Sequence, residues 1–281
     1  MPKAVLAEKT RTVQLGHTGI TWLNQDQYEA IREIGKFGFY GYETFAQVLE
    51  RFDAAGDLQP WLEQNHLPLI SGYCTINLTN TSKRAEELEK AGKWARLIKK
   101  YGGRVFVLGP NPVNREAYDY GANKADIVRM LNEVAKTVAS EGLTPVLHQH
   151  TNTCVMTRDE TYATLDAVDT TVLKFGPDVG QLTAGGADAV QVVKDYLPLV
   201  QHMHLKDYNG KDQHLVGYCP AGQGVVNFPA ILDMMEGRQL SGMIMSELDN
   251  LNACDPDPVP PHQLVGETVS YLKSIGVKFR T

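Results

Sequence analysis

Short apolar runs alternate with longer amphipathic runs along the whole chain. The short runs are rich in β-branched residues and predict eight strands, at 13–20, 39–44, 67–75, 104–108, 144–150, 171–178, 200–205 and 243–248. Between them, apolar positions recur at helical spacing and predict helices at 26–36, 82–101, 122–141, 158–168, 188–197, 228–237 and 262–275. Ser82 is the expected N-cap of the second helix. Strands that alternate with helices are typical of a parallel sheet joined by crossover helices.

The junction after the first predicted strand separates two architectures that eight such units could build. An open sheet that binds a dinucleotide would carry G-x-G-x-x-G at this point. This chain instead has Gly16-His17-Thr18-Gly19-Ile20-Thr21-Trp22. We therefore predict an α/β chain whose residues 1–281 form a single (β/α)₈ TIM barrel, a size that one barrel commonly reaches. The proline-rich piece 255–261 is interpreted as a loop at the mouth of the barrel.

Composition and charge exclude several kinds of partner. The net charge is −6 and no run of Lys or Arg supplies the basic stripe that nucleic acid needs. No stretch approaches the roughly 18 to 20 apolar residues that cross a bilayer, and the first residues lack the apolar core of a signal peptide. We expect a soluble cytoplasmic protein with no membrane partner, and leave open whether it forms a homo-oligomer. The cysteines form no C-x-x-C pair and are expected to be reduced, structural residues: Cys74, Cys154, Cys219 and Cys254.

Polar residues gather where four consecutive predicted strands end. In a parallel barrel these ends meet at one mouth, so such residues are functional candidates. The four ends read Leu147-His148-Gln149-His150, Gly176-Pro177-Asp178, His202-Met203-His204-Leu205-Lys206-Asp207 and Ser246-Glu247-Leu248-Asp249. Each end delivers a residue type that binds metals, and imidazole with carboxylate suits a first-row divalent ion better than Ca²⁺. The pattern predicts one divalent ion, with Mn²⁺ or Co²⁺ favoured and Mg²⁺, Fe²⁺ or Zn²⁺ as alternatives.

Each candidate also has an ordinary structural explanation. A single histidine inside a barrel is more often a satisfied polar residue than a ligand, and only the coincidence at four strand ends favours metal. Asp178 lies in a mostly apolar strand, where a buried carboxylate needs a partner or a metal. Glu43 could be catalytic, cap a helix or pair with Lys206, and the sequence leaves these open. The aromatic residues Trp22 and Tyr73 either line the substrate pocket or belong to the core.

These residues resemble the xylose-isomerase-like superfamily of sugar isomerases and epimerases, and within it the inosose (2-keto-myo-inositol) dehydratase family. The likeness rests on Thr21-Trp22, Gly41-Tyr42-Glu43, His148-Gln149-His150, Asp178, the run 202–207, the loop 222–228 and Glu247. It spans nearly the whole chain and implies a TIM barrel with a metal site. The ligands that the resemblance implies are His148, Asp178, His204 and Glu247.

Two departures from the family pattern concern the substrate. Gln181 stands where the family usually has a histidine that touches substrate, and the loop 249–261 is unlike the family's. We assign the remaining polar and aromatic candidates to substrate binding: Trp22, Gln181, His202 and Asp207.

His148 stands where most isomerases and epimerases of the superfamily have a glutamate. With only two carboxylates, the ion is less neutralised and a stronger Lewis acid, which favours polarisation of a ketone and stabilisation of an enediolate. A base then removes the proton beside the carbonyl; His150 is the first choice, with Glu43 and Lys206 as alternatives. Loss of the β-hydroxyl would then make the enzyme a metal-dependent lyase, a dehydratase of a keto-polyol or keto-sugar such as 2-keto-myo-inositol, and the resemblance implies a role in inositol catabolism.

Other outcomes share the same first step. Reprotonation elsewhere would give a keto-sugar isomerase or epimerase, and loss of a larger group would give a lyase that cleaves a 3-keto-glycoside. A non-catalytic sugar-binding barrel is a further alternative, but it would have no use for a polarising ion. The acidic charge balance argues against a nuclease.

Overall fold

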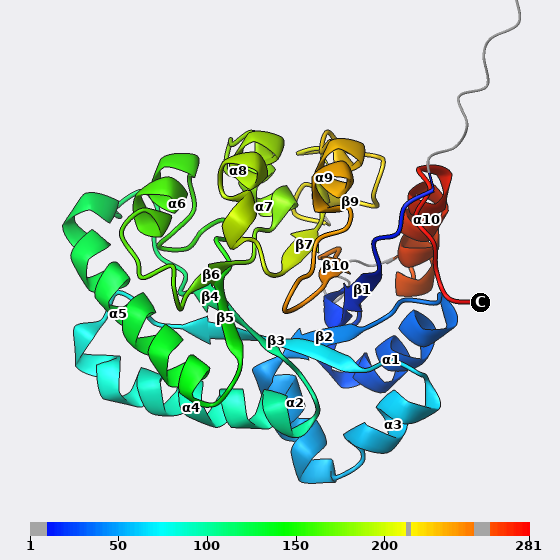
Figure 1. Cartoon of the computed structure of the whole chain (residues 1–281), viewed down its shortest axis with the longest axis horizontal. Helices are drawn as coiled ribbons and strands as arrows, with labels where there is room; N and C mark the ends of the chain where they lie inside the picture. Colours follow the sequence, from blue (N-terminus) through cyan, green and yellow to red (C-terminus); the bar gives the residue numbers. More distant parts are fainter. Residues whose placement is uncertain (1–9, 212–214, 250–258) are drawn as a thin grey trace, which may run out of the picture.

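The protein is described by a computed structural model that covers residues 10–211, 215–249 and 259–281. Eight parallel strands form one sheet in the order β6-β5-β4-β3-β2-β1-β10-β7, and helices surround them (Figure 1). The edge strands β6 and β7 approach each other through parallel bridges between Phe175 and Val200 and between Asp178 and His204. The sheet thus curves back on itself, and the predicted (β/α)₈ barrel is confirmed.

Every predicted strand overlaps an observed one. The strands of the barrel are β1 (Leu15–Thr18), β2 (Tyr42–Phe45), β3 (Leu69–Ile76), β4 (Val105–Pro110), β5 (Thr144–Leu147), β6 (Lys174–Phe175), β7 (Met203–Leu205) and β10 (Ile244–Ser246). Several end earlier than predicted, because the residues at the mouth leave the ladder. His150, for example, donates its backbone N–H to Val155 instead of a neighbouring strand.

The predicted helices are also present, with shifted ends. They are α1 (Gln27–Lys36), α4 (Arg84–Lys100), α5 (Tyr120–Ser140), α6 (Arg158–Leu165), α8 (Ala189–Asp195), α9 (Phe228–Met235) and α10 (Pro261–Ser274). The prediction that Ser82 caps a helix was wrong. Ser82 lies inside the short 3₁₀ helix η3 (Thr81–Lys83), whose cap is Asn80, and the Asn80 side chain accepts from the Ser82 backbone N–H.

Besides short 3₁₀ helices, three α-helices and two strands of the described residues had not been predicted. They are α2 (Ala46–Ala55), α3 (Leu58–Gln64), α7 (Val179–Ala184) and a small antiparallel pair of β8 (Asp207–Tyr208) and β9 (Tyr218–Cys219). α7 begins directly after the candidate residue Asp178, and β8 begins directly after Lys206. They therefore hold the segments that carry the candidate residues.

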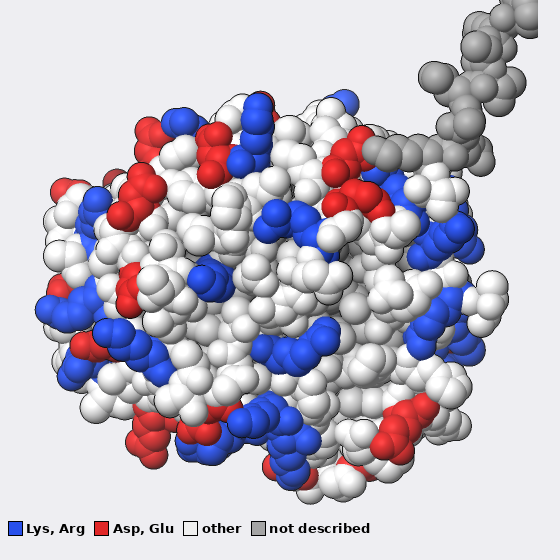
Figure 2. All heavy atoms as spheres, in the orientation of Figure 1, with Lys and Arg blue, Asp and Glu red and all other residues white. Residues whose placement is uncertain are grey.

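Most of the apolar side chains form one large core, which includes Cys74 and Cys154, as their sequence context predicted. Cys254 and most of the loop 249–261 lie outside the described residues. None of the described helices is long and apolar enough to span a membrane. Figure 2 shows Lys and Arg side chains dispersed over one face, many beside Asp or Glu, without a continuous basic stripe.

Candidate metal and substrate site

The four residues proposed as ligands lie together at the carboxyl ends of the strands. His148 follows β5, Asp178 follows β6, His204 lies in β7 and Glu247 follows β10. The backbone bridge between Asp178 and His204 places these two side by side. His148, Asp178 and His204 each offer a ligand atom within 4.8 Å of the other two, and Glu247 Oε2 lies 2.6 Å from His204 Nδ1. All four side chains are almost completely buried.

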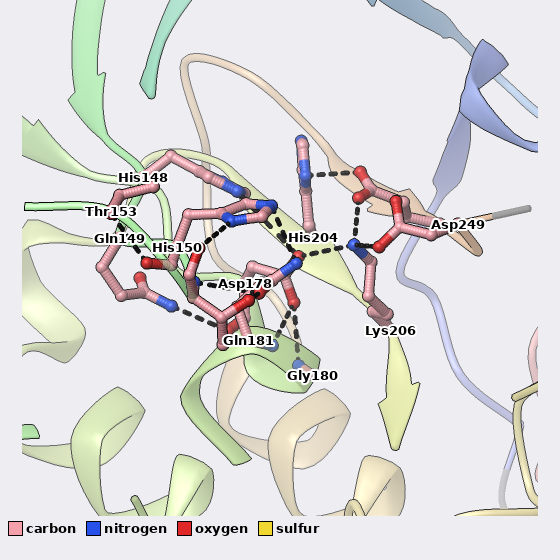
Figure 3. Close-up of polar contacts among 12 residues, drawn as sticks. His148, Gln149, His150, Thr153, Asp178, Gly180, Gln181, His204, Lys206 and Asp249 are labelled. Atoms are coloured by element: carbon pink, nitrogen blue, oxygen red, sulfur yellow. Dashed lines mark hydrogen bonds and ion pairs between the residues drawn. The ribbon is translucent and has the colours of Figure 1, made fainter. Parts of the chain in front are cut away.

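One oxygen of Asp178 is fixed by hydrogen bonds, and the other is open to a ligand, with the Lys206 ammonium nearby at 3.3 Å. Its Oδ1 accepts from the backbone N–H groups of Gly180 (2.8 Å) and Gln181 (2.9 Å), and so caps α7. Its Oδ2 accepts no hydrogen bond from the described residues and lies 3.9 Å from His148 Nε2. Burial raises the pKa of Asp178, although the ammonium of Lys206 opposes that shift. The helix cap thus aims a single carboxylate oxygen into the cluster (Figure 3).

His204 lies between two carboxylates. Its Nδ1 is 2.6 Å from Glu247 Oε2 and its Nε2 is 2.8 Å from Glu43 Oε1, although neither contact has hydrogen-bond alignment. Burial alone would lower the pKa of His204, but Glu247 and Glu43 together raise it well above its usual value. Burial would raise the pKa of Glu247, and His204 with Lys206 instead hold it well below its usual range. The two carboxylates therefore favour the positively charged, protonated form of the His204 imidazole.

His148 has the opposite environment. Burial, with the neighbouring His204 as the next cause, holds its pKa well below the usual value, so the ring is neutral. Its Nδ1 has no hydrogen-bond partner among the described residues, and Tyr73 packs edge-on against the ring at 5.3 Å. A neutral imidazole is the form that binds a metal ion.

The donor set fits a divalent ion. Buried polar atoms are normally hydrogen-bonded, yet His148 Nδ1, Asp178 Oδ2 and both ring nitrogens of His204 have no aligned partner in the described part of the chain. Two imidazoles and two carboxylates can supply four nitrogen and oxygen ligands of the kind that first-row divalent ions bind, and the two carboxylates balance the charge of the ion.

Lys206 is a buried cation beside this cluster, and it does not pair with Glu43. Its Nζ lies 2.5 Å from Glu247 Oε1, 2.8 Å from Asp249 Oδ2 and 3.3 Å from Asp178 Oδ2. Burial would lower its pKa, but Asp178, Asp249 and Glu247 raise the pKa of Lys206 well above its usual value. Lys206 therefore stays protonated.

His150 is fixed by a closed set of hydrogen bonds. Gln181 Oε1 accepts hydrogen bonds from the Thr151 backbone N–H (3.1 Å) and from the Thr151 hydroxyl (2.6 Å). The remaining amide atom of Gln181, Nε2, is therefore a donor. Gln181 Nε2 therefore donates to His150 Nε2 (2.9 Å), and His150 Nδ1–H donates to the Thr151 carbonyl (2.8 Å). These bonds make Nδ1 the donor and Nε2, with its lone pair, the acceptor of the His150 ring.

A small cavity of about 90 Å³ opens beside the cluster. Among its lining residues are His148, His150, Glu247, Glu43 and Tyr73, so the aromatic residue proposed as a pocket wall does border it. Its other lining residues, Thr18, Gly19, Ile20, Thr44 and Phe45, come from the first two βα units. Thr18 and Phe45 were missed, because neither belongs to a residue class that marks catalytic or metal-binding chemistry.

The four residues assigned to substrate binding do not line this cavity. Trp22 packs against His17, with ring centroids 5.8 Å apart, and Gln181 reaches the cavity only through His150. His202 is fully buried below His204, with its Nε2 2.9 Å from Glu43 Oε2.

Asp207, which was assigned to substrate binding, holds the loop 222–228 through its carboxylate. Its carboxylate accepts from the backbone N–H groups of Tyr208, Gly222, Gly224 and Val226. A Cβ on Gly224 would lie 2.1 Å from Asp207 Oδ1, so glycine is required for this close approach. Asp207 therefore fixes the glycine-rich loop.

His17, on β1, gives the fold a pH dependence. Burial lowers its pKa from 6.5 to about 4, while the Thr18 carbonyl opposes the shift. As the pH falls from about 6.5 to about 4, the unfolded chain binds a proton that the folded chain does not, so the unfolding free energy decreases by up to about 3 kcal/mol from this residue. In His17→Leu this part of the decrease should disappear.

Denaturant unfolding at a series of pH values from 4 to 8 measures the free energy of unfolding, and the variant of an exposed histidine, His262→Leu, is the control. If the unfolding free energy of His17→Leu changed with pH as it does in the unaltered protein, His17 would not cause this pH dependence.

Comparisons with known proteins agree with the architecture. The sequence model of the family described as "Xylose isomerase-like TIM barrel" matches residues 29–275. An inosose dehydratase of Clostridium perfringens is 24% identical, over 93% of this chain and 97% of that protein. The crystal structure of the probable 3-DHS dehydratase AsbF from Bacillus anthracis has a TM-score of 0.75 and 16% identity, over 93% of this chain and 99% of that one. The IOLI protein with a bound zinc atom has a TM-score of 0.74 and 16% identity, over 94% and 98%. At these identities the two structures show a shared fold.

Proposed function

We propose, for a chain that belongs to the xylose isomerase-like TIM barrel family, a divalent-metal-dependent dehydratase that acts on a keto-polyol or keto-sugar such as 2-keto-myo-inositol. The observation that carries this proposal is the convergence of four buried donors, His148, Asp178, His204 and Glu247, beside a cavity. The relative named inosose dehydratase supports the substrate class.

The ion would be held by His148, by Asp178 through its open Oδ2, by His204 through Nδ1 and by Glu247 through Oε2. When bound, it supplies electrophilic polarisation of a ketone and its neighbouring hydroxyl, which acidifies the adjacent C–H. Mn²⁺ and Co²⁺ remain the favoured ions, and Zn²⁺ is an alternative that the zinc-bound IOLI structure supports.

His150 is the best placed of the three candidate bases. It borders the cavity, and its Nε2 carries a lone pair, as a general base requires. Gln181 would give up its hydrogen bond when the substrate approaches this nitrogen. Lys206 is protonated and engaged by three carboxylates, so it cannot accept the proton. Its positive charge instead offsets the repulsion between Asp178 and Glu247.

One observation favours an epimerase or isomerase as the second candidate. Such an enzyme can use a single base that removes a proton from one carbon and returns it to the neighbouring carbon, and His150 presents a lone-pair nitrogen beside the cavity. No observation on the described residues favours the third alternative, cleavage of a 3-keto-glycoside.

The test combines metal analysis with a substrate panel. The purified protein should contain close to one divalent ion per chain and should release water from a keto-inositol without interconverting keto-sugars. Isomerised or epimerised product without water loss would replace the dehydratase by the second candidate. A protein that binds keto-polyols but no metal would indicate a non-catalytic barrel.

A further inference from the structure

Glu43 owes its position to an irregularity between β2 and β3. Tyr42 pairs with Leu69, but Glu43 pairs with Ser71, so the register shifts and Ile70 has no partner on β2. A bulge of this kind re-aims the side chains beside it. Gly41 makes room for it, since a Cβ there would lie 2.3 Å from Ile70 Cγ1. The bulge thus places a hydroxyl side chain, instead of an isoleucine, opposite Glu43.

Both oxygens of Glu43 are occupied. Oε2 accepts from the Ser71 hydroxyl (2.5 Å) and lies 2.9 Å from His202 Nε2, while Oε1 lies 2.8 Å from His204 Nε2. Glu43, Ser71, His202 and His204 are each at most 1% exposed. Each oxygen of this buried carboxylate therefore already has a partner among the surrounding side chains.

The hydrogen bonds of His202 fix its tautomer. The Met243 backbone N–H donates to His202 Nδ1 (3.3 Å), so the ring proton is on Nε2 and points at Glu43. Gly242 permits this arrangement, because a Cβ there would lie 2.4 Å from His202 Nδ1. His202 therefore donates to one oxygen of Glu43 and leaves the other oxygen to His204.

We propose that Glu43 is a positioning residue that holds His204 with its proton on Nε2 and its Nδ1 lone pair directed at the metal. This inference rests on the metal site of the proposed function. Histidines that bind metals usually donate their second ring N–H to a carboxylate or carbonyl, which fixes the ring and its tautomer. Here Glu43 Oε1 lies 2.8 Å from His204 Nε2, so a small rotation of the ring would align Glu43 as that acceptor. His202 and Ser71 in turn fix Glu43. Glu43 then acts through His204 and not on the substrate.

A glutamine at position 43 should disturb this arrangement although it has the same shape. Three groups direct a donor at Glu43, and an amide offers one oxygen where the carboxylate offers two. If the amide oxygen of the glutamine still accepts the hydrogen bonds from Ser71 and His202, the NH₂ group of the amide faces His204 Nε2. This group donates to Nε2 and so favours the tautomer of His204 with the proton on Nδ1. That tautomer cannot bind the ion through Nδ1.

The experiment uses the full-length protein with Zn²⁺ or Co²⁺ as the only ligand. In Glu43→Gln, the dissociation constant for either ion should rise roughly 10- to 100-fold, and the visible spectrum of bound Co²⁺ should change. Ser71→Ala keeps the carboxylate and should raise the dissociation constant only a few-fold. Glu87→Gln, which alters another buried, ion-paired carboxylate, is the matched control and should bind metal like the unaltered protein.

A measurement on the unaltered protein covers the case in which Glu43→Gln fails to fold. In the Zn²⁺ form, ¹⁵N NMR should find His204 protonated at Nε2 and unprotonated at Nδ1. Protonation at Nδ1 would overturn the inference while leaving the metal site intact. Near-normal Zn²⁺ affinity and an unchanged Co²⁺ spectrum in Glu43→Gln, with activity lost, would also overturn it and make Glu43 catalytic. If the unaltered protein binds no divalent ion, the proposed function fails and the inference fails with it.

Discussion

Asp178→Asn is expected to abolish tight binding of a divalent ion without unfolding the protein. Asparagine keeps an oxygen that can accept from the backbone N–H groups of Gly180 and Gln181, so the cap of α7 survives. It replaces the open Oδ2 by an uncharged NH₂ group that cannot bind metal. The metal dissociation constant should therefore rise by more than the roughly 100-fold reached by residues outside the ligand set, and water loss should fall at least as far.

The control for Asp178→Asn is a second helix-capping aspartate. Asp188 caps α8 by accepting from the Gln191 backbone N–H (3.1 Å), and it is exposed and remote from the cluster. Asp188→Asn should change neither metal content nor activity. Metal content by elemental analysis and affinity by titration calorimetry give the comparison, with circular dichroism to verify the fold. If Asp178→Asn retained one tightly bound ion per chain, Asp178 would not be a ligand.

The alternation of strands and helices was predictable because both periods are visible in the sequence. The elements that were missed are those whose signals are weak or interrupted. α2 begins at Ala46, the residue after β2, so no turn residues mark its start. α7 spans only Val179–Ala184, and α3 has a proline at its third position. Such short elements are stabilised mainly by the barrel against which they pack, and periodicity alone does not identify them.

The residues of the candidate site that lie at strand ends were predictable from the sequence. The contacts that depend on how neighbouring strands are aligned were not. Strand alternation correctly placed His202 and His204 on one face, since both contact Glu43. The sequence could not reveal that a one-residue shift in β3 sets Ser71 against Glu43, because a bulge has no compositional signal here. Nor could it show that Asp207 binds loop backbone, or that Lys206 pairs with Asp249 instead of Glu43. These partners depend on which side chains meet across the barrel.

His148→Glu is expected to separate two steps of the proposed reaction. A carboxylate at this position would join Asp178 and Glu247, so the variant should bind the ion while neutralising it further. A more neutralised ion polarises a ketone less, and water loss should fall by roughly 10- to 100-fold. The new carboxylate borders the cavity and can itself carry a proton, so exchange with solvent at the carbon beside the ketone should persist or increase.

Both steps would be followed on one keto-polyol in D₂O, with deuterium uptake and dehydration read from the same samples by NMR. His148→Gln provides the matched control, because it removes the imidazole without adding charge; it should weaken metal binding and reduce both steps together. Parallel loss of exchange and dehydration in His148→Glu that still holds metal would contradict the proposed division of labour. Persistent exchange with suppressed water loss would mean that the charge of the ligand at position 148 decides whether the enolate eliminates or is reprotonated.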